Sequence, residues 1–206
     1  MLFRSEAVVQ DADAAVAAAA RIGFPVVLKA VSASVPHKSD AGLVLLNIDN
    51  EAAVRAGVAT LAERCAKINA PLEGVLVAKM LKDGVEMVLG AQRDPEMGPV
   101  VMVGMGGVWL ELFKDVAFAP PGLGRARALE AIATTKASKL LAGYRGSPAR
   151  DVEALADAMV ALGVLANELG EIVESIDVNP LLVRSKGQGV AALDGLVVLR
   201  PPGAAV

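Results

Sequence analysis

A short loop between two apolar segments carries the residue types that phosphate chemistry requires. Lys29 closes the apolar stretch 24–29, and His37, the only histidine, follows it in the run Pro36-His37-Lys38. Lysine ammonium groups and free backbone N–H groups bind phosphate oxygens, and a neutral imidazole is an available nucleophile near pH 7. The loop predicts a polyphosphate site in which His37 accepts a phosphoryl group. By itself it fits an exposed, solvated histidine about equally well.

A second candidate site pairs an amide with a carboxylate. The predicted strand 172–178 leads to Asn179, and a glycine-rich turn returns the chain as the predicted strand 190–199, which contains Asp194. This hairpin would place Asn179 and Asp194 on neighbouring strands. Magnesium binds oxygen ligands, usually one or two from the protein, with water and phosphate oxygens completing the shell. The pair is a candidate magnesium site, although on spacing alone an Asn-Pro turn beside a strand-end aspartate is the simpler interpretation.

Two glutamates interrupt apolar segments that are typical of strands. Glu86 lies in the segment 85–92 and Glu111 in the segment 108–113. A carboxylate is rarely buried without a partner, so each should meet a cation, a backbone donor or solvent. Simple alternation also explains both as outward-facing positions of half-exposed strands.

Composition excludes several classes of protein. The formal net charge is -3 with a pI near 5.3, and the charges form no block of one sign, which argues against a nucleic-acid partner. The single cysteine, Cys65, forms no internal disulfide and fits a reducing compartment. The apolar runs of the chain are too short to span a bilayer, and the first residues lack the apolar core of a signal peptide. A soluble, cytoplasmic protein without membrane or nucleic-acid partners is expected.

Expected helices and strands alternate along the chain, which predicts an α+β fold. Helices are expected at 11–22, capped by Asp11 or Asp13, and at 50–67, capped by Asn50. The strands expected in the first half and the middle are 25–30, 42–48, 74–80, 85–92, 99–103 and 108–113. The last four, separated by turn signals, suggest one antiparallel sheet.

The second half is predicted to be mainly helical. One helix is expected over 125–141, and a second begins at Ser147-Pro148 and continues to about residue 170. The apolar residues of this second helix recur at helical spacing, which indicates a buried face.

Nine motifs, taken in order, resemble the ATP-grasp domain of NDP-forming acyl-CoA synthetases. This family includes the ADP-forming acetate–CoA ligases and is related to the β subunit of succinyl-CoA synthetase. The motifs are Gly23-Phe-Pro-Val-Val-Leu-Lys29, Pro36-His-Lys-Ser-Asp-Ala-Gly42, Gly84-Val-Glu86, Arg93-Asp-Pro, Gly98-Pro-Val-Val-Met, Gly104-Met-Gly-Gly107, Lys114-Asp115-Val, Leu140-Leu-Ala-Gly-Tyr-Arg-Gly146 and Ile176-Asp-Val-Asn-Pro180. The resemblance extends from about residue 23 to about residue 199.

The resemblance implies an ATP-grasp fold over 1–206, with two α+β lobes at about 20–75 and 76–200 and the nucleotide between them. Compared with the family, the chain begins without the usual first helix and strand. Lys29 would contact the nucleotide phosphates, and the segment from Val77 to Lys79 would present backbone groups to the adenine, although the family usually has an acidic residue at position 79.

The resemblance also assigns the metal and the reaction. Asn179 and Asp194 would hold Mg²⁺, with Glu86 and Glu111 as further carboxylates on the nucleotide or metal side. His37, beside Lys38, would relay a phosphoryl group between a partner histidine and ATP/ADP. Acid, CoA and ATP would be converted to acyl-CoA, ADP and phosphate, in either direction. An α-type CoA-binding subunit or fused domain would bind most of the acyl-CoA and the acid.

Two other classes of function are compatible with the sequence. An ATP-grasp ligase that activates a carboxylate for attack by an amine would not need His37. A non-catalytic nucleotide-binding or assembly module would need neither His37 nor a partner that binds CoA.

Overall fold

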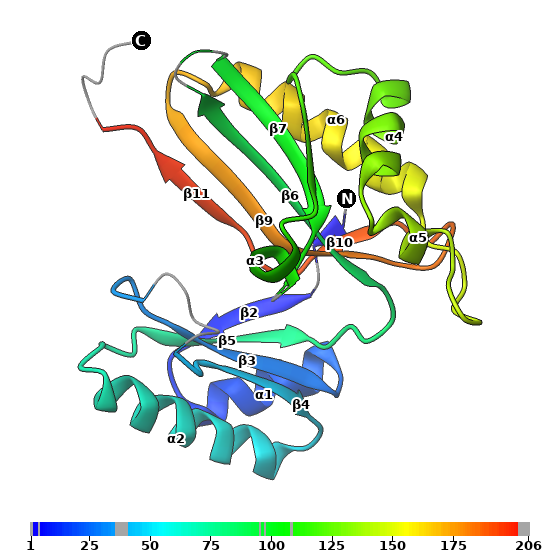
Figure 1. Ribbon diagram of the computed structural model, residues 1–206. Coiled ribbons are helices and arrows are strands. Elements are labelled where there is room, and N and C mark those ends of the chain that lie inside the picture. Colours follow the sequence, from blue (N-terminus) through cyan, green and yellow to red (C-terminus); the bar gives the residue numbers. More distant parts are fainter. Residues whose placement is uncertain are drawn as a thin grey trace. The chain divides into compact units, whose positions relative to one another are not determined.

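The chain forms two compact units (Figure 1). The computed structural model describes residues 2–3, 5–35, 41–94, 96, 98–107 and 109–201, without the side chains of residues 2, 3 and 111. The small unit is Arg4–Lys82, and the large unit combines Met1–Phe3 with Asp83–Val206.

The small unit is an antiparallel sheet with two helices on one face (Figure 1). Its strands lie in the order β2-β5-β3-β4. In chain order its elements are β2 (Glu6–Val9), α1 (Ala12–Ile22), β3 (Val26–Val31), β4 (Val44–Ile48), α2 (Glu51–Lys67) and β5 (Gly74–Lys79). The predicted helix starts are confirmed, because the side chains of Asp11 and Asn50 accept backbone N–H bonds of 2.8 Å at the N-termini of α1 and α2.

The large unit is a seven-stranded sheet in the order β1-β10-β9-β6-β7-β8, with β11 also paired to β9. Helices α4 and α6 cover one face and enclose the larger core (Figure 1). Its elements are β1 (Leu2–Phe3), β6 (Val85–Asp94), β7 (Gly98–Met105), α3 (Trp109–Phe113), β8 (Val116–Ala119), α4 (Arg125–Thr134), α5 (Ser138–Leu141), α6 (Val152–Glu168), β9 (Val173–Val183), β10 (Val190–Ala192) and β11 (Leu196–Leu199).

Several sequence-based predictions are wrong in the large unit. The segment 108–113 was expected to be a strand, but its described part is helix α3, in which Trp109 and Phe113 stack with ring centroids 5.7 Å apart. Residues four apart meet on a helix, so this aromatic pair favours the helical conformation. Glu111 therefore lies in a helix.

The other differences concern helix boundaries and strand partners. The helix expected over 125–141 is broken into α4 and α5, and α6 begins after Asp151 rather than at Ser147-Pro148. The four predicted middle strands do not form one sheet. Of the four, only β6 and β7 pair in the large unit, because β5 belongs to the small unit's sheet and the segment 108–113 is not a strand.

A buried arginine anchors the first residue of the large unit's main segment. The side chain of Arg150 is only 8% exposed, and its Nη1 lies 2.6 Å from Oδ1 of Asp83. The hydroxyl of Ser185 donates to the other carboxylate oxygen at 2.9 Å. These two donors hold the pKa of the Asp83 carboxyl below its ordinary value, with the Arg150 hydrogen bond as the larger cause.

We expect Asp83→Asn to lower the free energy of unfolding near pH 7 but not in strong acid. Because the folded-state pKa is depressed, the carboxylate stabilises the fold above its unfolded pKa, about 4, and this contribution disappears as pH falls through the folded pKa. Urea unfolding at about pH 7 and about pH 2 measures the difference. Asp157→Asn, which breaks a half-exposed pair with Arg125, should have little effect at either pH. The same loss at both pH values for Asp83→Asn would contradict this explanation.

Candidate functional site

The loop that carries His37 is anchored on both sides. His37 and Lys38 themselves lie outside the described residues. Before them, the Ala33 N–H donates to Oε1 of Glu73 at 3.2 Å. After them, the guanidinium of Arg64 on α2 donates to the carbonyl oxygen of Gly42, and Leu43 is fully buried in the small unit's core. The two flanks of the loop are thus bonded to different parts of the same unit, the residue before β5 and helix α2.

The three nucleotide candidates of the small unit lie on β3 and β5. Lys29 is on β3 and only 7% exposed, so its charge is weakly screened by solvent. Val77 is fully buried on β5, between Ala7 of β2 and Leu28 of β3. At the end of β5, Nζ of Lys79 donates to the carbonyl oxygens of Gly23 and Phe24, at 2.8 and 3.0 Å. The lysine, where the family usually has an acid, therefore fastens the start of β3.

A glycine loop in the large unit lies between Glu86 and Asn179. The N–H of Gly107 donates to Oδ1 of Asn179 at 3.0 Å, and the N–H of Gly106 donates to the carbonyl oxygen of Glu86 at 3.0 Å. Gly107 has φ +62, and a Cβ there would lie 2.6 Å from Oε2 of Glu86. The glutamate is exposed on β6. This loop brings the side chains of Glu86 and Asn179 to the same end of the sheet.

Strand register places Asp194 opposite Asn179. Both β10 and β11 pair with β9, at Leu181–Ala192 and at Asp177–Leu196, so residues 193–195 run past residues 178–180. The Leu193 N–H donates to the carbonyl oxygen of Pro180 at 3.0 Å and fixes this alignment. Asp194 thus lies in the connection between two strands rather than within one long strand.

The donors at this end of the sheet fit magnesium. Because Oδ1 of Asn179 accepts the Gly107 N–H, the orientation of the amide oxygen is fixed. Asp194 is partly exposed, and its Oδ1 accepts the Gly195 N–H at 3.0 Å. The described residues contain no group of three or more His, Cys, Asp or Glu side chains that could hold a metal ion. Mg²⁺ usually binds one or two protein oxygens together with water and substrate phosphates, so an amide oxygen and a carboxylate without a full protein cage are compatible with a phosphate-bound ion.

Comparison with known proteins identifies the family. A family model described as an ATP-grasp domain matches residues 3–199. The chain belongs to the ATP-grasp family. The acetate–CoA ligase (ADP-forming) I subunit β of Pyrococcus furiosus is 42% identical over 93% of this ATP-grasp chain and 82% of its own length. Trans-feruloyl-CoA synthase FCS1 of an unknown prokaryotic organism is 43% identical over 92% of the chain, which spans 27% of that longer protein.

Solved structures support the same fold. The ATP-grasp chain superposes on dinucleotide-forming acetyl-coenzyme A synthetase 1 of Ca. Korarchaeum cryptofilum, in complex with coenzyme A, Ca-AMPCP and HgCl+, with a TM-score of 0.90 and 40% identity. The match covers 96% of this chain and 86% of that one. Another structure of that synthetase contains coenzyme A and Mg-AMPPCP, with a phosphohistidine segment pointing towards the nucleotide binding site, and has a TM-score of 0.81. The α+β, ATP-grasp prediction is confirmed.

Sequence reasoning missed the supports around these candidates. Arg64 and Glu73 reach the histidine loop from positions far along the chain, and no local pattern marks them. The run Gly104-Met-Gly-Gly107 was noted as a motif, but its contacts with Glu86 and Asn179 appear only in the folded sheet.

None of the helices formed by described residues has both the length and the apolar character needed to cross a lipid bilayer.

We expect Gly106→Ala to destabilise the large unit by about 1–3 kcal/mol. A Cβ at this position would lie 2.4 Å from the carbonyl oxygen of Met87 in β6. Because β6 is hydrogen-bonded to a strand on each side, it cannot shift to make room. Gly122→Ala is the matched control, because a Cβ there meets nothing within 4 Å. Urea titration of both variants measures the difference in free energy of unfolding. Equal stability of the two would show that the glycine loop lies less close to β6.

Proposed function

We propose that this chain is the nucleotide-binding, phosphoryl-transfer unit of an ADP-forming acyl-CoA synthetase. The observation that carries the proposal is the similarity to a named β subunit over most of both chains. The overall reaction would convert acyl-CoA, ADP and phosphate into acid, CoA and ATP, and would run in either direction. The whole activity is a proposal because the chain spans only about a quarter of several relatives, such as the feruloyl-CoA synthase.

His37 would carry the phosphoryl group. In the direction from ATP, a neutral ring nitrogen attacks the γ-phosphorus as the bond from phosphorus to the β–γ bridging oxygen breaks, and ADP leaves with that electron pair. The reverse step returns the group to ADP. Lys29, nearly buried on β3, and Lys38 would offset negative charge on the transferred group. The contacts of Ala33 and Gly42 support this role, because they fix the chain on both sides of the segment that carries His37.

Asn179 and Asp194 would hold Mg²⁺. The assignment is supported by the strand register that sets the two residues opposite each other and by their oxygen donors. The ion would neutralise charge on the nucleotide phosphates. Glu86, held beside the same glycine loop, would be a further carboxylate on the nucleotide side, and Glu111 on the metal or phosphate side.

The segment from Val77 to Lys79 would serve the adenine. Because Val77 is paired on both sides, its own backbone groups lie within the sheet, and contacts with the base would come from the Lys79 end. Lys79 already donates to two carbonyl oxygens just before β3. Its ammonium group would therefore hold that part of the chain, and would not take over the nucleotide contact of the acidic residue usual in the family.

A CoA-binding unit would complete the enzyme. The P. furiosus relative is named as subunit β, and the longer relatives contain most of their length outside the matched region. The partner, either a separate α-type subunit or the rest of a fused chain, would bind the acyl-CoA and the acid. This assignment leaves the nucleotide, magnesium and phosphoryl relay to the present chain.

A reconstituted assay tests the proposal. The chain is mixed with the CoA-binding unit of the same enzyme, acetyl-CoA, ADP, phosphate and Mg²⁺, and ATP is measured. Formation of ATP that requires both proteins supports the proposal. ADP formation from ATP, a carboxylate and an amine, without CoA, would instead identify an amine ligase. Nucleotide binding without either reaction would identify a binding module.

A further inference from the structure

A surface loop in the large unit holds an arginine in a backbone conformation that favours glycine. Arg145 has φ +49 and lies between Gly143, with φ +93, and Gly146, with φ +87. Left-handed backbone is unfavourable for residues with a Cβ and easy for glycine. Turn bonds hold the loop, including one of 3.1 Å from the Ser147 N–H to the Tyr144 carbonyl oxygen. An arginine in this place points to a use for its side chain.

The side chains of this loop extend into solvent. Tyr144, the only tyrosine, is 52% exposed, and the guanidinium carbon of Arg145 lies 5.4 Å from the centroid of its ring. All residues from 144 to 149 are exposed. The loop is therefore a protrusion, and its aromatic and cationic groups pack on each other rather than on the core.

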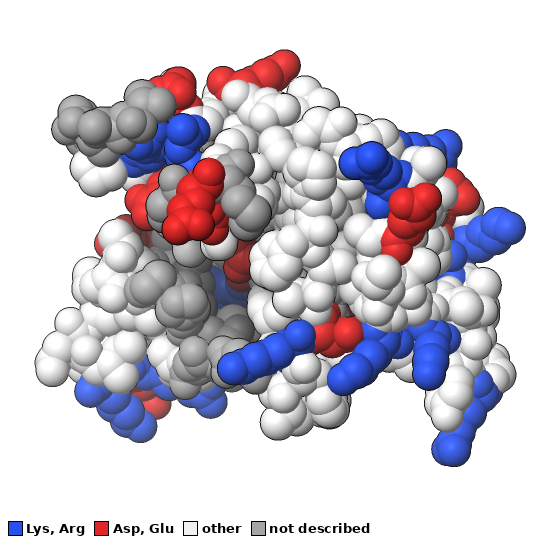
Figure 2. Space-filling view, turned by 45° about the horizontal axis from the view of Figure 1, so that its top comes forward, with Lys and Arg blue, Asp and Glu red and all other residues white. Residues whose placement is uncertain are grey.

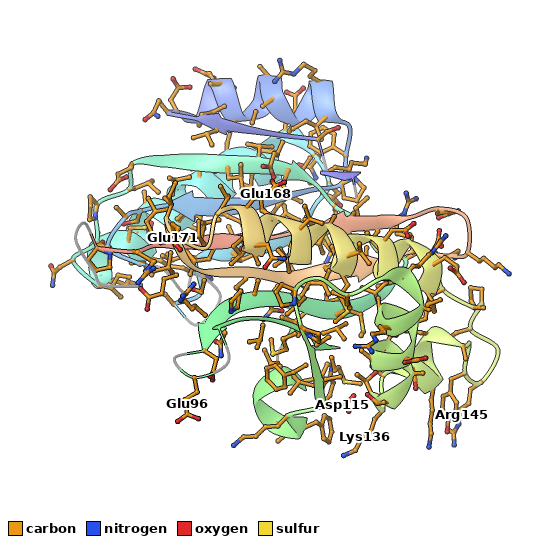
Figure 3. All side chains as sticks on the ribbon, turned by 90° about the horizontal axis from the view of Figure 1, so that it is seen from above. Glu96, Asp115, Lys136, Arg145, Glu168 and Glu171 are labelled. Carbon is orange, nitrogen blue, oxygen red and sulfur yellow. The ribbon has the colours of Figure 1, made fainter. Side chains whose placement is uncertain are left out.

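The segment that contains the loop carries only positively charged side chains, although the whole chain is acidic. Residues 131–149 contain no Asp or Glu, whereas the formal net charge of the chain is -3. Lys136, Lys139 and Arg145 are exposed, and none forms an ion pair with a carboxylate that the structure describes. Lys136 and Arg145 extend outward on the same side of the large unit (Figure 3). On the side where α4 and α5 lie, Lys and Arg side chains occur with Asp and Glu side chains among them (Figure 2).

We propose that Lys136, Lys139, Tyr144 and Arg145 form a basic surface that docks an acidic face of the CoA-binding unit. The partner's identity rests on the proposed function, and its chemistry rests on charge complementarity, since a surface with only positive charges favours docking of an anionic surface. Tyrosine and arginine are the residue types that most often carry binding energy in protein interfaces. A convex loop suits a protein surface better than a small anion, which would need a concave site.

Charge reversal and strain relief separate docking from a structural role. Arg145→Glu and Lys139→Glu should each raise the Kd for the separately produced CoA-binding unit at least about tenfold at about 50 mM NaCl, and less at about 300 mM. Arg145→Gly should also weaken binding, while leaving the melting temperature unchanged or raising it, because glycine relieves the left-handed strain. Lys67→Glu, an equal charge change at the exposed end of α2 in the small unit, should leave the Kd within about twofold.

The outcomes distinguish this inference from the proposed function. If the variants bind the CoA-binding unit as tightly as the wild type does, the docking surface is wrong, and ATP formation by the wild-type mixture would still support the proposed function. If the variants lose binding but the wild-type mixture forms no ATP, the surface stands and the proposed reaction fails. Absence of any binding by the wild type at about 50 µM would overturn the docking surface.

Discussion

A His37→Asn variant should form ATP at less than about one thousandth of the wild-type rate in the reconstituted reaction. Asparagine is polar and of similar size, but it has no nitrogen nucleophile that can accept and release a phosphoryl group. Affinity for Mg-ATP, measured by calorimetry, should stay within about threefold, because the nucleotide contacts assigned to Lys29, Asn179 and Asp194 remain. The variant thus separates phosphoryl transfer from binding.

A control in the same loop makes this result specific. Ser34 is exposed, and its hydroxyl lies 3.0 Å from that of Ser32, so Ser34→Ala changes the loop without touching the proposed nucleophile. Its rate should stay close to that of the wild type. Robust acyl-CoA-dependent ATP formation by His37→Asn would show that the phosphoryl group passes directly between the partner and ADP.

Asp194→Ala should weaken Mg-ATP binding at least about tenfold while leaving the melting temperature within a few degrees. The carboxylate lies in a partly exposed connection between β10 and β11, so its removal leaves no large cavity. Calorimetric titration with Mg-ATP and a thermal melt measure the two quantities. The loss should shrink when the nucleotide is titrated without a divalent ion, because the proposed contact is through Mg²⁺.

The matched control removes another carboxylate of the large unit. Asp157 on α6 pairs with Arg125 at 3.1 Å, and its side chain is 60% exposed. Asp157→Ala should leave the affinity for Mg-ATP unchanged. An Asp194→Ala variant that folds and binds Mg-ATP as the wild type does would remove Asp194 from the site.

Local chemistry predicted the parts of the fold whose signals are local. Asp11 and Asn50 cap the helices that their sequences indicate, since each side chain bonds an N–H three residues later. The break between α4 and α5 could not be found in this way. There the buried carboxylate of Asp115 accepts the N–H groups of Lys136 and Ala137 at 2.8 and 2.9 Å, from more than twenty residues away.

The start of α6 was mispredicted for a similar reason. Ser147-Pro148 has the composition of a helix start, but Asp151 caps the helix by accepting the Ala154 N–H and also accepts the Gly189 N–H at 2.8 Å. The second bond comes from the β9–β10 turn and exists only in the folded unit. A local pattern therefore competed with a tertiary contact, and the contact decided the boundary.

The candidate site shows the same division. Residue type and order marked Asn179 and Asp194, and the register of β9 with β10 and β11 sets them opposite each other. The prediction that both residues lie on neighbouring strands is wrong for Asp194, because Asp194 occupies the break between β10 and β11. A break in one strand, opposite a partner strand that continues, produces no periodic pattern in the sequence, so it could not be predicted.

Phosphoryl labelling of the chain tests the central claim most directly. The chain is incubated with its CoA-binding unit, acetyl-CoA, Mg²⁺ and radiolabelled phosphate, without ADP, and the label on this chain is located by peptide mapping. The proposed relay predicts label on His37 that is stable in base and lost in acid, as a phosphoramidate is. It also predicts that later addition of ADP transfers the label to ATP. Because His37 is the only histidine, an acid-labile label has one possible histidine position. ATP formation by the same mixture with ADP, but no label on this chain at any time before ADP is added, would contradict the account.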